Sequence, residues 1–352
     1  MTATSSFSQR LLHWFRQGHR DLPWRHTTDP WAIWVSEIML QQTRVETVRE
    51  PYQRFLQSYP DPASLAGISD DELMLAWRGL GYYRRARLLR DGARRVVETH
   101  GGVVPGTIAE LRELPGIGPY TLGAVGSIAF GHPEPAVDGN VERVASRHRG
   151  LDAPIGTSPA RRAIRAVVVD WLDEKNAGDF NQALMELGAT VCTPTSPGCG
   201  DCPVASDCIA KRDRRTGELP VKKAQRAAVE VTARVLLALR HGKRGQEALG
   251  YRIPADQPNA GQIELPGPGV LVDCDPDDLA ETVQKRFSAR LETGATVAEI
   301  RHGITHHRIT LHAHMAKSVA ERGRLRWFTR DGETPWTTVS RKVFAQTNVL
   351  EA

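Results

Sequence analysis

The stretch LPGIGPYTLGAVGSIAF, residues 114–130, places two glycines between two apolar segments. We expect one helix to end at Leu114 and another to begin near Tyr120, with Gly116 and Gly118 in the tight turn between them. Glycine allows the backbone dihedral angles of such a turn, and the open amides at the start of the second helix face outward. The stretch therefore predicts a helical hairpin that can bind an anion; the alternative is an ordinary turn between two helices.

The segments around this hairpin predict two kinds of architecture. From Ser8 to about Ala210 the chain reads almost wholly as helix, because apolar residues recur three and four positions apart and Pro and Gly interrupt the pattern. After a charged, proline-containing segment, residues 229–240 and 305–316 alternate like strands, and residues 275–291 between them read as a helix. We therefore predict a mainly α N-terminal body and a smaller α/β C-terminal domain.

The segment CTPTSPGCGDCPVASDC, residues 192–208, holds four of the chain's five cysteines with the spacing C-x6-C-x2-C-x5-C. Disulfides are the weakest explanation, because they persist in oxidising compartments and the N-terminal residues show no export signal. Zinc sites mostly pair their cysteines in C-x2-C knuckles, whereas an iron-sulfur cubane accepts irregular spacings. The spacing favours a cluster and leaves zinc open as the alternative, with the ligands Cys192, Cys199, Cys202 and Cys208.

The composition sets wide limits on the partner. The 352 residues carry a formal net charge of +5, which is compatible with a polyanionic partner but does not establish one. Apolar runs are too short to span a membrane, so we expect no membrane partner and a cytoplasmic, nucleoid-associated location.

Three segments together carry a family resemblance. LPGIGPYT (114–121), VDGNVERV (137–144) and the cysteine segment resemble the helix-hairpin-helix DNA glycosylases of the endonuclease III superfamily. The resemblance covers roughly residues 8–210. It implies double-stranded DNA as the partner, phosphate binding at Gly116 and Gly118, and a [4Fe-4S] cluster on the four cysteines.

The resemblance also implies a domain layout. We expect a catalytic region, a connector, a Nudix-like domain and a C-terminal tail, at residues 1–215, 216–228, 229–345 and 346–352. Within the catalytic region we expect a six-helix module over about residues 30–137 and an iron-sulfur module formed by residues 1–29 with 138–215.

Tyr120 bears on whether the enzyme also cuts the DNA strand. Superfamily members that cut it carry a lysine at the matching position, where the amine attacks the sugar and forms a Schiff base. A phenol cannot form an imine. The resemblance therefore implies a monofunctional glycosylase that leaves the abasic site uncut.

Glu37, in WVSEIMLQQTRVETV (34–48), is the predicted general acid. Apolar neighbours such as Trp34, Ile38 and Leu40 should bury its carboxyl group and raise its pKa toward neutrality. This segment, together with GLGYY (79–83), resembles the adenine glycosylases of the MutY type, in which this glutamate protonates the purine at N7.

Asp138 is the second predicted carboxylate. By analogy with retaining glycosidases it would stabilise the oxocarbenium-like sugar, and it can also cap the helix that follows it. The resemblance implies that Tyr120 and Asn140 tune the two carboxylates by hydrogen bonds. It further implies that Arg25, Glu37 and Gln182 contact the extruded adenine.

Two further residues are expected to act on the DNA duplex, because a base inside a duplex must be extruded before it can react. In the family pattern Gln42 wedges into the stack and Tyr82 stacks beside it; the alternative for Tyr82 is core packing. Arg84 and Arg85, which follow the tyrosine pair, are expected to bind phosphate.

The C-terminal domain is expected to recognise the lesion. QIELPGPGV (262–270) resembles the strand and turn before a Nudix box, but the metal-binding R-E-x-x-E-E run is missing, so we expect no pyrophosphatase activity. In HGITHHRI (302–309), Thr305 and His306 can still hydrogen-bond 8-oxoguanine, while Ile304 stands where many family members carry an aromatic residue.

The resemblance thus implies a monomeric adenine DNA glycosylase of base excision repair that acts on A:8-oxoguanine and A:G mispairs. One alternative is a thymine or uracil glycosylase for G·T mismatches, which also carries a tyrosine at the hairpin position. Another is a non-catalytic iron-sulfur protein that binds DNA. Glu37 and the long C-terminal domain favour the adenine enzyme over the first, and Glu37, Tyr120 and Asp138 together favour it over the second.

Overall fold

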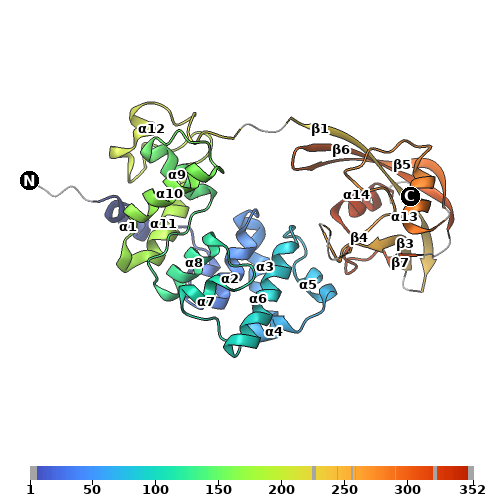
Figure 1. The fold of residues 1–352 in the computed structure, drawn as a ribbon, viewed down its shortest axis with the longest axis horizontal. Coiled ribbons are helices and arrows are strands. Elements are labelled where there is room, and N and C mark those ends of the chain that lie inside the picture. Colours follow the sequence, from blue (N-terminus) through green and yellow to red (C-terminus); the bar gives the residue numbers. More distant parts are fainter. Residues whose placement is uncertain are drawn as a thin grey trace, which may run out of the picture. The chain divides into compact units, whose positions relative to one another are not determined.

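The computed structural model describes residues 6–223, 227–243, 245–254, 257, 259–289, 291–319 and 323–347 (Figure 1). Contacts between Cα atoms divide the chain into two compact units. One comprises the described parts of 1–68, 79–81 and 85–225, and the other the described parts of 69–78, 82–84 and 226–352. In the part of the chain that is described, no helix is long and apolar enough to cross a membrane.

The N-terminal unit is helical, as predicted. Its α-helices are α1 (Phe7–Gln17), α2 (Pro30–Leu40), α3 (Val45–Ser58), α4 (Pro62–Ala66), α6 (Arg84–His100), α7 (Ile108–Arg112), α8 (Pro119–Phe130), α9 (Gly139–Arg149), α10 (Ser158–Trp171), α11 (Ala177–Thr190) and α12 (Ile209–Arg212). Short 3-10 turns are η1 (Pro23–Arg25), η2 (Glu174–Asn176) and η3 (Ala205–Asp207). Helix α5 (Asp70–Ala76) groups by contacts with the second unit.

The predicted hairpin lies between α7 and α8. Helix α7 ends at Arg112, two residues before the expected end, and α8 begins at Pro119. Gly116 has a φ of 85°, a left-handed value that favours glycine. Gly118 is the N-cap residue of α8 and has no side chain to cap the helix. Because Pro119 at the first position has no N–H, the first amides that α8 offers are those of Tyr120 and Thr121.

Helix α2 is the buried centre of this unit. Every residue from Trp31 to Met39 is buried, which is typical of a helix enclosed on all sides. Asp29 caps its N-terminus by accepting hydrogen bonds from the amides of Trp31 and Ala32. Helix α6 packs closely against it at Gly92, where a Cβ atom would lie 2.5 Å from the Trp34 ring and 2.6 Å from the Pro115 carbonyl oxygen.

A second core joins helices from both ends of the unit. Helix α1 packs with α9, α10 and α11 through Phe7, Leu11, Phe15, Val141, Val144, Ile164, Trp171, Phe180 and Leu184. The N-terminal segment therefore packs with the segments that flank the cysteines.

The C-terminal unit contains two sheets, so its predicted α/β class is confirmed. Its elements are β1 (Val229–Leu237), β2 (Leu239–Gly242), β3 (Gly245–Arg252), β4 (Ile263–Glu264), α13 (Leu279–Phe287), β5 (Leu291–Ile304), β6 (His307–Val319), β7 (Leu325–Thr329) and α14 (Thr338–Thr347). One sheet has the order β1-β6-β5, and the other joins β2, β4 and β7 to β3. Strand β1 runs parallel to β6, with Val229 beside His307.

Thr305 and His306 form the two-residue turn between β5 and β6, since Ile304 pairs with His307. The expected domain end at residue 345 falls inside α14, which continues to Thr347. The rest of the expected tail, residues 348–352, lies outside the described residues.

Candidate active site

A cavity of about 790 Å³ lies in the N-terminal unit, within the size range of small-molecule sites. Side chains from η1, α2, the turn after α2, α8, α9 and α11 line it. The structure brings together in this cavity the predicted residues Arg25, Glu37, Gln42, Tyr120, Asp138, Asn140 and Gln182.

Glu37 is buried, with 4% of its surface exposed. The hydroxyl of Tyr120 donates a hydrogen bond to Glu37 Oε2. Burial and the charge of Asp138 raise the pKa of Glu37 to about 7, against the opposing effects of the Tyr120 hydrogen bond and Arg25. Burial also raises the pKa of Tyr120, which therefore stays a hydrogen-bond donor. Glu37 can thus carry a proton near neutral pH.

Asp138 caps the helix that follows it, as expected, and also accepts a hydrogen bond from Asn140. Its Oδ1 accepts from the Val141 amide at 2.8 Å and so caps α9, while Oδ2 accepts from Asn140 Nδ2 at 2.8 Å. Burial raises its pKa, whereas these hydrogen bonds and the nearby Arg143 guanidinium lower it. The carboxyl group is held in place with a defined orientation at the cavity.

Arg143 links this part of the cavity to the cysteine segment. It donates to Asn140 Oδ1 at 2.8 Å, to the Gly188 carbonyl at 2.7 Å and, through Nε, to the Cys192 carbonyl at 2.7 Å. A chain of hydrogen bonds therefore runs from Cys192 through Arg143 and Asn140 to Asp138.

Glu186, which the sequence analysis did not identify, forms a second charged group at the cavity. Only 2% of its surface is exposed, and it accepts from Arg20 NH2 at 2.7 Å and from Arg25 NH2 at 2.8 Å. Burial opposes ionisation, but hydrogen bonds from the two arginines outweigh it and lower the pKa of Glu186 to about 2. The sequence could have indicated this residue. Glu186 lies four positions after Gln182 and therefore on the same face of a largely apolar helix.

The residues expected to act on the duplex lie at the surface. Gln42 is exposed at the cavity rim and Tyr82 is 62% exposed, so the core-packing alternative for Tyr82 is wrong. Both have left-handed backbone conformations, with φ values of 58° and 47°. Tyr82 is not among the residues that line the cavity.

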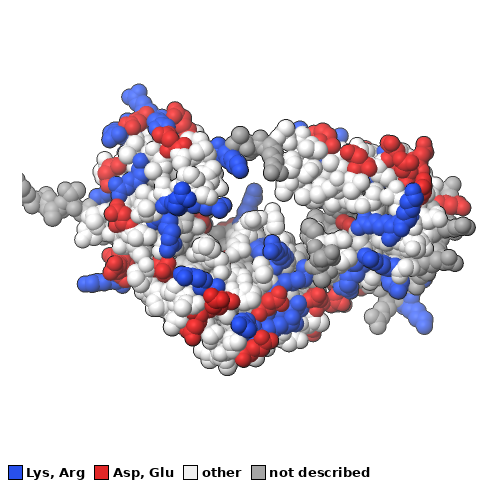
Figure 2. Space-filling view, viewed as in Figure 1, with Lys and Arg blue, Asp and Glu red and all other residues white. Residues whose placement is uncertain are grey.

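The expectation for Arg85 was wrong. Arg84 is exposed, but Arg85 is buried and its guanidinium donates to backbone carbonyls inside the protein. It is therefore not a phosphate-binding cation. Basic and acidic side chains are interspersed over the visible face of the helical unit (Figure 2), so its net charge does not identify a DNA-binding face.

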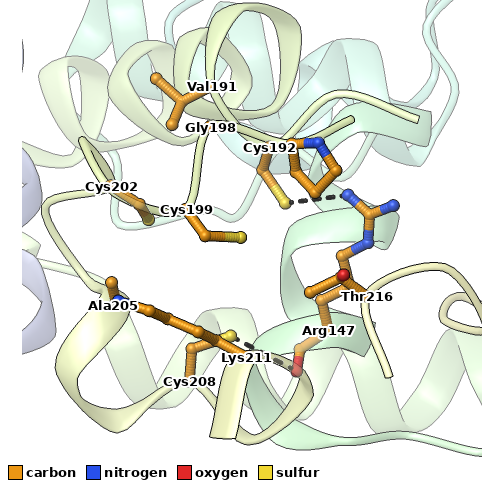
Figure 3. Close-up of a pocket in the computed structure, with 11 residues that line it drawn as sticks. Arg147, Val191, Cys192, Gly198, Cys199, Cys202, Ala205, Cys208, Lys211 and Thr216 are labelled. Carbon is orange, nitrogen blue, oxygen red and sulfur yellow. Dashed lines mark hydrogen bonds between the residues drawn. The ribbon is translucent and has the colours of Figure 1, made fainter. Parts of the chain in front are cut away.

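The four clustered cysteines surround one small space of about 30 Å³ (Figure 3). They are free thiols, so the disulfide explanation is not supported. Arg147 lies beside them, with NH1 3.5 Å from Cys192 Sγ and further bonds to the Thr193 and Pro194 carbonyls. Burial, with a smaller effect of the neighbouring sulfurs, raises the pKa of the Cys202 thiol to about 11.

The thiols form a sulfur donor set of the kind that soft metal centres use. Within the described ranges, no three His, Cys, Asp or Glu side chains converge as the ligands of a single metal ion would.

Thr305 and His306 lie in the C-terminal unit, at the β5–β6 turn. Thr305 is exposed, with a φ of 54°, and its hydroxyl donates to the Ile304 carbonyl at 2.7 Å. Ile304 is partly buried and packs against the core of this unit.

Comparisons with known proteins relate this chain to DNA repair glycosylases. A family model described as HhH-GPD superfamily base excision DNA repair protein matches residues 35–168. The human adenine DNA glycosylase is 46% identical over 217 residues, which are 59% of this chain and 40% of that protein. The adenine DNA glycosylase of Buchnera aphidicola subsp. Baizongia pistaciae is 32% identical over 239 residues, 68% of each chain. This chain thus spans less than half the length of the human relative.

Two of the solved structures that are similar to this chain differ widely in the share they cover. A thermostable thymine-DNA glycosylase is 30% identical with a TM-score of 0.55, over 59% of this chain and 95% of that one. A MutT Nudix hydrolase from Burkholderia pseudomallei, 18% identical, covers 33% of this chain and 97% of that one with a TM-score of 0.28.

Proposed function

This chain belongs to the adenine DNA glycosylase family of base excision repair proteins, and from that premise we propose that it hydrolyses the N-glycosidic bond of adenine mispaired with 8-oxoguanine or guanine. The observation that carries the proposal is the buried Glu37, whose pKa of about 7 lets it act as an acid in the cavity that Asp138 also lines. A carboxyl group near its pKa at working pH is an effective general acid.

The chemistry follows from these two carboxyl groups. Protonated Glu37 gives its proton to N7 of the extruded adenine, and the C–N bond then breaks with its electron pair going to the base. The sugar becomes oxocarbenium-like, and the Asp138 carboxylate stabilises the positive charge until water attacks. Position 120 supplies a phenol and no amine, so the product is an uncut abasic site.

Polar groups on η1 and α11 would hold the base. Arg25 and Gln182 line the cavity, and Glu186 fixes Arg25 through the hydrogen bond between them. Paired donors and acceptors of this kind recognise the edge of a flipped base. Tyr120 orients Glu37 and Asn140 orients Asp138, as their hydrogen bonds support.

Contacts with the duplex would come from surface residues. Gln42 would enter the stack and Tyr82 would stack beside it, while the hairpin at Gly116 and Gly118, with the first amides of α8, would bind a phosphate. Residues 229–345 would form the Nudix-like domain, where Thr305 and His306 would hydrogen-bond 8-oxoguanine. The exposure of Thr305 at a strand turn supports that role.

The four cysteines would hold a [4Fe-4S] cluster, as thiolates. Its contribution would be to fix the segment 192–208 by ligation, since the base chemistry transfers no electron. Iron and acid-labile sulfide analysis with an absorption spectrum tests this: about four of each per chain supports the cluster, and zinc with no sulfide contradicts it. Cys199→Ser should lower folded yield and DNA affinity together; a cluster-free protein with normal binding contradicts the structural role.

Single-turnover assays test the activity itself. We expect adenine release from an A:8-oxoguanine duplex and from an A:G duplex, and none from a G·T duplex. Thymine release from G·T in place of adenine release would favour the mismatch glycosylase alternative. Duplex binding with no abasic product from any of the three would favour the non-catalytic alternative. Sedimentation with and without duplex checks that one monomer binds one mispair.

A further inference from the structure

Arg85, near the start of α6, is a buried arginine that donates hydrogen bonds to several backbone carbonyls and to one hydroxyl. Only 8% of its surface is exposed. NH1 donates to the carbonyls of Ile38 at 2.7 Å and Met39 at 2.8 Å, and also to that of Gln41. NH2 donates to the carbonyls of Leu80 at 2.9 Å and Gly81 at 3.1 Å and to Thr43 Oγ1 at 3.0 Å.

These acceptors belong to two separate stretches of chain. The first is the C-terminal end of α2 and the turn after it, which carries Gln42. The second is the Gly79–Leu80–Gly81 stretch, which leads directly into Tyr82. Thr43 adds a second bridge, because its hydroxyl lies 3.3 Å from the Leu80 carbonyl. One guanidinium therefore joins the backbones that present both proposed DNA-contacting side chains.

Both side chains need such support. Gln42 and Tyr82 have φ values of 58° and 47°, which residues other than glycine rarely adopt. A backbone in such a conformation persists only where the surrounding structure holds it. The carbonyls at the end of α2 also lie at the negative end of the helix dipole, where a cation is favourable. Arg85 supplies both the support and the charge.

The planar guanidinium is essential to this geometry. Its donors form a rigid fork that reaches acceptors on both stretches at once, whereas a lysine ammonium is a single point of charge with three donors. The same contacts fix the end of α2, the helix that carries Glu37. The hydrogen bonds of Arg85 thus connect the Gln42 turn and the Gly79–Gly81 stretch with the helix that carries Glu37.

We propose that Arg85 is a positioning residue that holds the Gln42 turn and the Gly79–Gly81 stretch, which leads into Tyr82, in fixed conformations, and that this support drives extrusion of the target base. The proposal rests on the proposed glycosylase function. Burial excludes direct phosphate binding, and the two acceptor stretches distinguish Arg85 from an arginine that only stabilises its own helix.

The test compares Arg85→Lys with Arg90→Lys. Arg90 lies on the same helix, is 6% exposed and donates to the Ile68 carbonyl at 3.2 Å, outside both turns. Both variants are made in the Glu37→Gln background, so that no base is released. A 2-aminopurine replaces the target adenine opposite guanine, and its fluorescence at saturating protein reports extrusion.

We expect Arg85→Lys to lower the extrusion equilibrium at least about tenfold, since displacements near 1 Å in positioning groups cost up to about a hundredfold. Affinity for an undamaged duplex should change less than about threefold, because no phosphate contact is lost. Arg90→Lys should extrude normally. Normal extrusion by Arg85→Lys, or an equal loss in Arg90→Lys, overturns the proposal.

A second variant covers the case in which Arg85→Lys does not fold. Thr43→Val keeps the side-chain volume and removes the hydroxyl between the two turns, so extrusion should fall about threefold; unchanged extrusion overturns the proposal. Adenine release by the protein with Glu37 intact is measured separately. A protein that extrudes 2-aminopurine and releases no adenine contradicts the proposed chemistry and leaves the role of Arg85 in place.

Discussion

Glu37 on α2 and Glu186 on α11 line the same cavity and are almost equally buried, with 4% and 2% of their surface exposed. Their pKa values nevertheless lie at about 7 and about 2. Glu37 accepts a hydrogen bond from a neutral phenol, whereas Glu186 accepts from two guanidinium groups. The charge of a carboxyl group therefore depends on its hydrogen-bond partners as well as on its burial. One glutamate is kept ready to give a proton, and the other is a permanent anion.

Glu37→Gln should have the largest effect, because it removes the acid and preserves the size of the side chain. We expect the single-turnover rate of adenine release to fall about 10²- to 10⁴-fold. The duplex dissociation constant, measured by fluorescence anisotropy, should change little. A rate within a few-fold of the parent would remove Glu37 from the acid role.

The pH dependence of release should reflect Glu37 and not Glu186. Protonated Glu37 is the active form, so the rate should fall about tenfold for each pH unit above about 7, or about a hundredfold by pH 9. Asp138 must be ionised, and its raised pKa should produce a decline on the acidic side. Single-turnover rates between pH 5 and 9 measure this; a flat profile up to pH 9 would contradict the assignment.

Glu186→Gln should destabilise the fold, because it leaves Arg20 and Arg25 without their carboxylate. We expect the free energy of unfolding in urea to fall by about 3 kcal/mol, the order found when one partner of a buried ion pair is removed. Adenine release should fall about tenfold as Arg25 loses its position. Glu98→Gln, at an exposed position on α6, is the matched control and should change neither.

Tyr120→Phe should have the smallest effect on the rate. It tests whether the hydrogen bond from Tyr120 helps to set the pKa of Glu37. The Tyr120 hydrogen bond lowers the pKa of Glu37, so its loss should raise that pKa and move the alkaline limb of the pH profile to higher pH. The rate at the optimum should fall about threefold for the lost hydrogen bond. A limb that moves to lower pH would show that Tyr120 acts in another way.

Local patterns predicted the parts of the site that depend on local chemistry. The glycine pattern predicted the tight turn at Gly116, and the apolar residues beside Glu37 in the sequence predicted the burial of its carboxyl group. Glu186 and Arg20 could not be paired in this way, because 166 residues separate them and only the packing of α11 brings them together. Arg85 was misread because two adjacent arginines look alike in a charged run, and only the fold shows which one is buried.

In the C-terminal sheet, too, local sequence patterns predicted only some of the strands. The alternating residues of β1 and β6 predicted strands at the right places. Strand β5, their partner in the sheet, was not predicted. Its pairing with β6 contains register shifts between Leu291 and Ala298, and such irregularities interrupt the two-residue period on which the prediction depends.

Gly92 does not line the cavity, yet a mutation at this position would disturb the helix and the hairpin that position cavity residues. Any side chain at this position would press on Trp34, in the helix that carries Glu37, and on Pro115, in the α7–α8 hairpin. Every missense codon reachable from glycine by one nucleotide change adds at least a Cβ atom. In a mutational scan for loss of mismatch repair we therefore expect position 92 to tolerate as few alleles as the residues of the pocket.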